Sequence, residues 1–206
     1  MEASISFKFF LYFVVIISAV FHEYCHGWMA NFLGDPTAKY AGRLTLNPLR
    51  HIDVMGTVVI PLFLLFFLGG FIGWAKPVPY NPYNLRDQRF GSTKVALAGP
   101  GANFSIALIF GLAVRFLPME GMLLVLLSWI IYINIFLGLF NLIPLPPLDG
   151  SKVLIDFFPQ SNILRILSQS SMGIFLAVIL AIMFLPYLSD GIYYLIAGQP
   201  FYGLLF

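Results

Sequence analysis

The segment that decides the fold is residues 7–33, FKFFLYFVVIISAVFHEYCHGWMANFL. It exceeds the roughly 20 apolar residues that span the hydrocarbon core of a bilayer, and its only charged side chains are Lys8 and Glu23. No small-residue cleavage site follows the apolar stretch, so we expect a retained transmembrane helix and not a signal peptide. A membrane helix that carries Glu23 between His22 and His26 is unusual, because polar side chains are costly in hydrocarbon unless they have partners.

The composition of the whole chain agrees with a membrane location. Of its 206 residues 60% are hydrophobic and only 10% are charged, whereas a soluble domain carries about 25% charged residues. The mean hydropathy is +0.90. The net charge is only +2 and there is no run of Lys and Arg, so we expect the lipid bilayer as a partner and no nucleic acid. The single cysteine, Cys25, excludes an internal disulfide.

The apolar stretches predict an all-α polytopic membrane protein. Four of them are long enough for full transmembrane helices: 7–33, 93–117, 121–143 and 168–188. A fifth, 54–73, is broken by Pro61 and by Gly69-Gly70. We therefore expect about four full spans plus one re-entrant or short apolar segment.

The remaining segments are polar connections. Residues 34–53 and 74–92 are rich in turn residues, and the alternation in Arg43–Leu46 indicates a small β-hairpin near residues 41–47. The sequence has no internal repeat and no appended soluble domain, so we expect residues 1–206 to form a single membrane-embedded domain.

The distribution of cations favours a re-entrant path for 54–73. If this segment returns to its starting side, nine cations lie on one side of the membrane and only Lys8 and Arg115 on the other. The nine are Lys39, Arg43, Arg50, Lys76, Arg86, Arg89, Lys94, Lys152 and Arg165. If the segment crosses, the cations divide almost evenly. The sequence therefore predicts a multi-pass protein of the cell membrane, with the N-terminus outside and the nine cations in the cytosol.

The motif His22-Glu23-Tyr24-Cys25-His26 has the HExxH pattern. Residues four apart on an α-helix lie about 40° apart around the axis and about 6 Å along it, so both imidazoles can bind one ion. Two His ligands and a nearby carboxylate are typical of a site in which Zn²⁺ activates the water that attacks a peptide carbonyl. His22 lies about 21 Å along the helix from Lys8, so we expect the metal beneath the cytosolic face.

The third ligand follows by elimination. Position 32, where one class of zinc proteases has another His, is Phe32, and the only downstream Glu, Glu120, lies in a short outer loop. Asp149, in NLIPLPPLDG of residues 141–150, lies where the third full span reaches the cytosolic side, which is the depth of the two histidines. We expect Asp149 to complete the site. The competing explanation is that it caps a helix over Ser151–Phe158. Other aspartates lie in the polar segments or after the last span: Asp35, Asp53, Asp87 and Asp190.

These motifs resemble the site-2 protease family, zinc metalloproteases that cut substrates within the membrane, and in particular its compact prokaryotic branch without PDZ or CBS domains. The resemblance covers most of residues 15–155. It rests on HEYCH of residues 22–26, GRLTLNPLRHID of 42–53, GWAKPV of 73–78, AGPGAN of 98–103 and NLIPLPPLDG of 141–150. It implies one Zn²⁺ per chain bound by His22, His26 and Asp149, with Glu23 as general base. It also implies that Asn103 and Asn141 hold the substrate backbone.

Two polar pairs have simpler explanations as well. A lone Asn in a membrane helix needs a hydrogen-bond partner, and for Asn103 and Asn141 that partner is either a neighbouring helix or the substrate. His51 and Asp53 are candidates for a second metal pair, but we favour a role in anchoring their loop.

The function expected from these observations is that of an intramembrane zinc metalloendopeptidase, with residues 1–206 as its metalloprotease domain. Its substrates would be transmembrane proteins or peptides, cut within or near a membrane span, at an active site towards the cytosolic side. One alternative is a membrane metal transporter, which predicts ligands spaced along a path. The other is a catalytically silent binder of membrane segments, which has no use for Glu23.

Overall fold

The computed structural model describes residues 5–67, 73–161, 166–167 and 172–201. Four helices are long and apolar enough to cross a membrane: α1 (Ile5–Phe32), α4 (Gly91–Phe116), α5 (Gly121–Leu142) and α8 (Met172–Ala197). The expected all-helical, multi-pass membrane fold is thereby confirmed. The last helix continues beyond the predicted end at residue 188, while residues 168–171 and 202–206 lie outside the described part.

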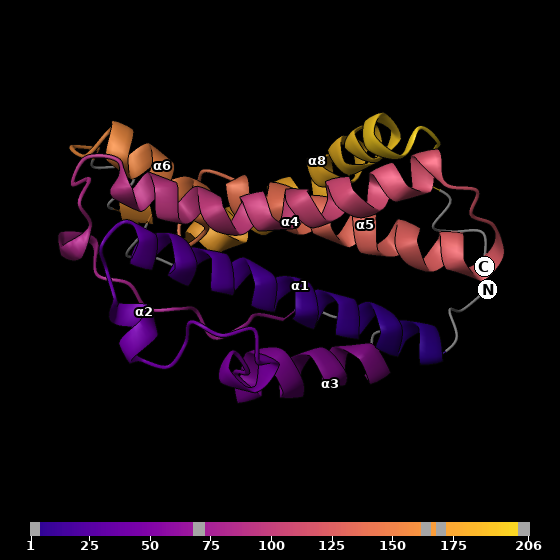
Figure 1. Ribbon diagram of the computed structural model, residues 1–206, viewed down its shortest axis with the longest axis horizontal. Coiled ribbons are helices and arrows are strands. Elements are labelled where there is room, and N and C mark those ends of the chain that lie inside the picture. The colour runs from indigo at the N-terminus through magenta and orange to yellow at the C-terminus, as the bar shows by residue number, and fades with distance from the viewer. Residues whose placement is uncertain (1–4, 68–72, 162–165, 168–171, 202–206) are drawn as a thin grey trace.

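The long helices run side by side along the longest axis of the molecule (Figure 1). Helix α4 packs against both α1 and α5, and α8 packs against α5 and α4. The cluster of buried side chains between α4, α5 and α8 consists of Ala107, Val114, Ile131, Ile135, Tyr193 and Ala197. Large apolar side chains such as Phe13, Ile109 and Ile182 are exposed, as expected of surfaces that face lipid.

The described part of the fifth apolar segment forms two short helices, and neither is long enough to span a bilayer. They are the π-helix η2 (Val54–Val59) and α3 (Ile60–Phe67), the latter lying beside α1 (Figure 1). The Asp53 side chain caps η2 by accepting a hydrogen bond from the Gly56 N–H at 2.7 Å. Residues 68–72, which include Gly69-Gly70, lie outside the described part.

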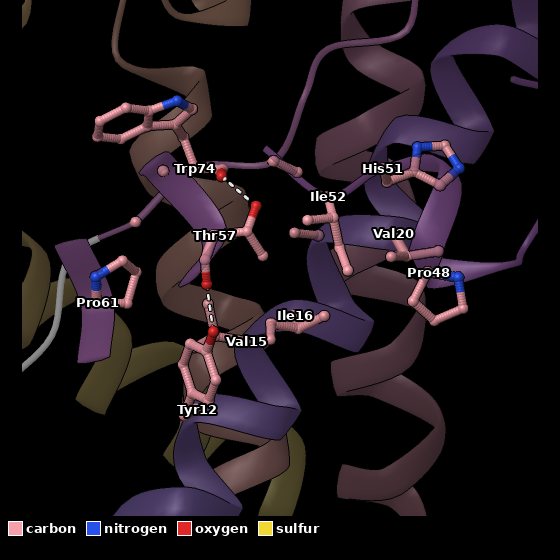
Figure 2. Close-up of a pocket in the computed structure, with 14 residues that line it drawn as sticks. Tyr12, Val15, Ile16, Val20, Pro48, His51, Ile52, Thr57, Pro61 and Trp74 are labelled. Atoms are coloured by element: carbon pink, nitrogen blue, oxygen red, sulfur yellow. Dashed lines mark hydrogen bonds between the residues drawn. The ribbon is translucent and has the colours of Figure 1, made fainter. Parts of the chain in front are cut away.

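After α3 the chain returns to the level from which it started. The Trp74 N–H donates to the Gly56 carbonyl and the Lys76 N–H to the His51 carbonyl, each at 2.9 Å. Figure 2 shows Thr57 between the carbonyl of Trp74 and the hydroxyl of Tyr12 on α1. A small cavity of about 40 Å³ lies here, between α1 and the returning chain. The bond from Tyr12 thus holds the first part of the segment against α1, and the returning chain is bonded to that first part.

The two polar connections lie together at one end of the helices. The buried Asp35 carboxylate accepts hydrogen bonds from the Asn81 N–H at 2.6 Å and from the Asn84 side chain at 2.9 Å. The Arg86 N–H donates to the Leu33 carbonyl at 2.8 Å. Residues 34–53 and 74–92 thus occupy the same side, as the re-entrant model requires.

The predicted β-hairpin near residues 41–47 is wrong: this fully described segment contains turns and coil but no strand. Its polar groups bond elsewhere, since the Arg43 N–H donates to the Ala38 carbonyl and the Thr45 carbonyl bonds the His51 ring at 2.8 Å. An isolated two-stranded hairpin is marginally stable, so these local bonds prevail. The expected loop-anchoring role of His51 is confirmed.

A short helix brings the chain back towards α4. After a bend, α6 spans Asp149–Phe157, and its Asp156 carboxylate accepts hydrogen bonds at 2.8 Å from both the backbone N–H and the hydroxyl of Thr93. Because Thr93 lies in the first turn of α4, this contact ties the end of α6 to the start of α4.

Candidate metal centre and active site

The two histidines of the motif lie on one buried face of α1, as their spacing predicts. His22 and His26 are each 7% exposed, and their Nε2 atoms lie 2.9 Å apart. They face α4, whose backbone and side chains contact the far side of each ring.

The outward hydrogen bond of each ring determines its tautomer. The His26 Nδ1 atom lies 2.7 Å from the Val95 carbonyl, which can only accept, so Nδ1 carries the proton. The His22 Nδ1 atom lies 2.7 Å from the Asn103 Oδ1 atom. In both rings a proton on Nδ1 leaves the lone pair on Nε2, which is the form that binds a metal.

The orientation of Asn103 is fixed by a chain of buried amides. The Asn134 amide nitrogen donates to the Ile130 carbonyl at 2.9 Å and to the Ser18 hydroxyl at 3.0 Å, so the Asn134 oxygen must be the acceptor from Asn103. The Asn103 oxygen therefore faces His22. This network connects α1, α4 and α5 behind the His22 ring.

Asp149 provides the third converging atom. Its Oδ2 atom lies 3.1 Å from the His22 Nε2 and 3.0 Å from the His26 Nε2, while its Oδ1 atom accepts from the Lys152 ammonium at 3.0 Å. Leu148, not Asp149, occupies the N-cap of α6 and no side chain caps that helix, so the competing capping role is wrong.

These three atoms form a site that fits a zinc ion. Ligands about 2.0–2.1 Å from tetrahedral zinc lie roughly 3.3 Å from one another, close to the 2.9–3.1 Å separations seen here. All three atoms present lone pairs, so a cation between them removes their mutual repulsion. The backbone of Gly99 leaves room beside them, since a Cβ there would lie 2.4 Å from the His26 Nε2 and 2.6 Å from the His22 Nε2.

Glu23 lies beside this triangle without being part of it. One carboxylate oxygen of Glu23 and one ring nitrogen of each histidine lie within 4.8 Å of one another. The Glu23 Oε2 atom accepts a hydrogen bond from the Val78 N–H at 2.7 Å, which fixes the carboxylate. The Val78 side chain packs against α1 at Gly27, where a Cβ would lie 3.0 Å from it. The returning chain therefore positions Glu23.

An open cavity of about 150 Å³ borders the site. The residues that line it are His22, Glu23, His26, Pro77, Val78, Tyr80, Asn141, Pro147, Leu148, Asp149 and Lys152. Asn141 is thus brought to the cavity, with its amide nitrogen bonded to the Leu137 carbonyl at 3.0 Å. Asn103 is fully buried behind His22 instead.

Several groups that hold the site residues in place could hardly be identified from the sequence. The Val78 N–H and the Val95 carbonyl are backbone groups, which every residue type provides. Asn134 is a lone amide in a membrane helix and is marked by that property alone. Lys152 pairs with Asp149 three residues before it, and this i,i+3 spacing is the signal by which the pair could have been predicted.

Comparison with known proteins gives concordant matches. The model of Peptidase family M50 matches residues 9–186. The putative zinc metalloprotease YwhC of Bacillus subtilis is 34% identical over 180 residues, which cover 83% of this chain and 79% of that protein. The putative zinc metalloprotease Rip2 of Mycobacterium tuberculosis is 31% identical over 142 residues, 68% of this chain and 53% of Rip2.

A third relative, the putative zinc metalloprotease MJ0611 of Methanocaldococcus jannaschii, is 31% identical over 154 residues, 70% of this chain and 71% of that protein. This chain spans about half the length of Rip2. No solved structure gave a significant match.

Proposed function

The chain belongs to peptidase family M50, the site-2 protease family of membrane-embedded zinc metalloproteases, and from this we propose that His22, His26 and Asp149 bind its zinc and that Glu23 is its general base. The expected resemblance is confirmed by the family match, and the metal-transporter and silent-binder alternatives have no support from the relatives. We propose that residues 1–206 act as one metalloprotease domain.

One observation carries the assignment of the residues. Two nitrogens and one carboxylate oxygen from α1 and α6 meet within 3.1 Å, each with its lone pair directed inward. Each of these ligand groups is held from behind by Val95, Asn103 or Lys152. Such preorganisation is what a catalytic metal site requires.

The residues of this chain then have distinct roles in hydrolysis. Zinc bound at this site supplies a Lewis acid that polarises the scissile carbonyl and lowers the pKa of a water. Glu23 accepts a proton from the attacking water and passes it to the leaving amine nitrogen. The Val78 N–H holds one oxygen of Glu23 and leaves the other to face the reacting atoms.

The substrate is proposed to be a membrane-spanning segment of another protein, bound in extended form. Its carbonyls must be free of helical hydrogen bonds before one can reach the site. Asn141 lines the cavity, and we assign its amide to the substrate backbone. Asn103 supports this role only indirectly, by orienting His22.

The active site is proposed to face the cytosolic side of the cell membrane. The polar connections 34–53 and 74–92 lie at the site's end of the molecule. They carry six of the eleven cations, Lys39, Arg43, Arg50, Lys76, Arg86 and Arg89, and Lys94 follows two residues after the second connection. The positive-inside rule places such loops in the cytosol.

The decisive experiment measures zinc content and cleavage together. A transmembrane peptide substrate in detergent is incubated with the wild type, Glu23→Gln, and Glu120→Gln, which makes the same chemical change at an exposed residue. We expect about one zinc per chain in all three and cleavage by all but Glu23→Gln. Cleavage by Glu23→Gln at the wild-type rate would refute its role, and a wild type that bound no zinc would refute the site.

A further inference from the structure

A second hollow, larger than the catalytic cavity, opens beside it. It has a volume of about 540 Å³ and is lined by Lys76, Pro77 and Pro79, while Pro77, Val78 and Tyr80 line the catalytic cavity. Its lining includes three basic residues, Arg43, Arg50 and Lys76. Among the described residues that line it, none is acidic.

The charges of this basic hollow are available for a ligand. Arg50 and Lys76 are exposed, and neither forms an ion pair within the described part of the chain. Other cations at the same end are already engaged: Lys94 pairs with Asp87 at 2.6 Å, and Lys152 with Asp149 at 3.0 Å. The tendency of cytosolic loops to be basic explains the number of Lys and Arg residues at this end of the molecule. It does not explain why cations without an ion pair are grouped around one hollow.

Arg43 makes one wall of the hollow rigid. Its guanidinium donates to the Lys76 carbonyl at 2.7 Å and to the Pro77 carbonyl at 3.4 Å, and the Lys76 N–H is bonded to the His51 carbonyl. The backbone that carries Lys76 is therefore fixed before any ligand arrives, which lowers the entropic cost of binding.

The same wall separates the hollow from the reacting residues. Pro77 lines both cavities, and the next residue, Val78, donates its N–H to Glu23. A hollow of this volume is about 8 Å across, the length of two to three extended residues. A peptide that leaves the catalytic cavity past Pro77 thus enters the basic hollow within a few residues.

We propose that the basic hollow binds an acidic stretch of the substrate, within a few residues of the membrane segment that is cut and on the same side of the membrane as the active site. This inference rests on the proposed peptidase function and names the substrate class: transmembrane proteins with Asp or Glu next to the span. The exposed positions of Arg50 and Lys76 give charge selectivity and faster association more than tight binding. Because each exposed pair contributes little, the preference comes from several charges acting together.

The test measures binding separately from cleavage. Fluorescent peptides share one apolar span and carry three Glu, three Gln or three Lys at either end. Their Kd is measured on Glu23→Gln protein in zwitterionic nanodiscs, and their kcat/KM on protein with Glu23 intact. The test variant is Arg50→Glu/Lys76→Glu. The control, Lys39→Glu/Arg89→Glu, makes the same change of charge at exposed residues that do not line the hollow.

We expect the protein with native basic residues to bind the Glu peptide about ten-fold more tightly than the Lys peptide, a ratio that falls as salt screens the charges. The test variant inverts this order and the control variant keeps it. Equal Kd values for all flanks, or an equal change in both variants, would overturn the proposal. So would a charge effect that depends on added anionic lipid and not on the flank, since it would identify a lipid headgroup as the occupant. Flank-selective binding without cleavage would retain this inference and reject the peptidase function.

Discussion

Replacing Gly99 by alanine tests whether the empty space beside the two imidazoles is needed for metal binding. A Cβ at this position would lie 2.4 Å from the His26 Nε2 and 2.6 Å from the His22 Nε2. Ordinary contacts between heavy atoms begin near 3.5 Å, so the rings or α4 must move by about 1 Å. A metal site tolerates changes of only about 0.2 Å in its ligand distances.

The expected loss follows from the cost of such overpacking. Inserting a methyl group into a packed site costs about 1–3 kcal/mol, and each 1.4 kcal/mol corresponds to a ten-fold change in an equilibrium constant. If the strain is relieved by displacing the ligands, zinc affinity falls about 5- to 150-fold. Cleavage at limiting free zinc should fall in parallel.

Gly101, on the same helix, supplies the matched control because a Cβ there would meet nothing within 4 Å. Gly99→Ala and Gly101→Ala both gain helix propensity of about 1 kcal/mol, so they differ mainly in what the new methyl group touches. Zinc content is measured by elemental analysis after dialysis against buffered free zinc, with helicity followed by circular dichroism. If Gly99→Ala binds zinc within two-fold of Gly101→Ala, the packing argument is wrong.

Three further predictions concern zinc affinity, the dependence of stability on pH, and membrane topology. Asn103→Ala removes the acceptor of the His22 ring, so zinc affinity should fall about 10- to 100-fold; unchanged zinc affinity in equilibrium dialysis would count against this role. Hydrogen bonds from Thr37, Asn84 and Asn81 outweigh burial and hold the pKa of Asp35 below its ordinary value, so its stabilising effect is present above about pH 4 and is lost as the pH falls through the lowered pKa. The difference in Tm between wild type and Asp35→Asn should therefore shrink on acidification, and a pH-independent difference would contradict it. Tyr83→Cys, in a Cys25→Ser background, should react with an impermeant maleimide from the cytosolic side, because Tyr83 is 84% exposed at the end of the molecule that carries the site; labelling from outside would reverse the proposed topology.

The sequence by itself determined the features that depend on local periodicity and on hydrophobicity. The spacing of His22 and His26 places both rings on one face of α1, and run lengths identify the four spans. Counting the membrane crossings also predicted that Asp149 lies on the same side as the two histidines, because each span must end on the side opposite to its start. The choice of a re-entrant path for 54–73 followed from charge alone, and the hydrogen bonds of Trp74 and Lys76 agree with it.

Only the tertiary structure decided the features that depend on contacts between segments distant in the sequence. Which nitrogen of each histidine faces the Asp149 carboxylate depends on the Val95 carbonyl and on Asn103, and the position of Glu23 depends on the Val78 N–H. Backbone groups are the same in every residue, so no pattern of side chains reveals them. The hairpin prediction was wrong for a related reason. Alternation in 41–47 indicates which side chains a strand would bury, but not which groups its backbone bonds. Here the backbone of Arg43 and Thr45 bonds Ala38 and His51, and those contacts exist only once the chain has folded.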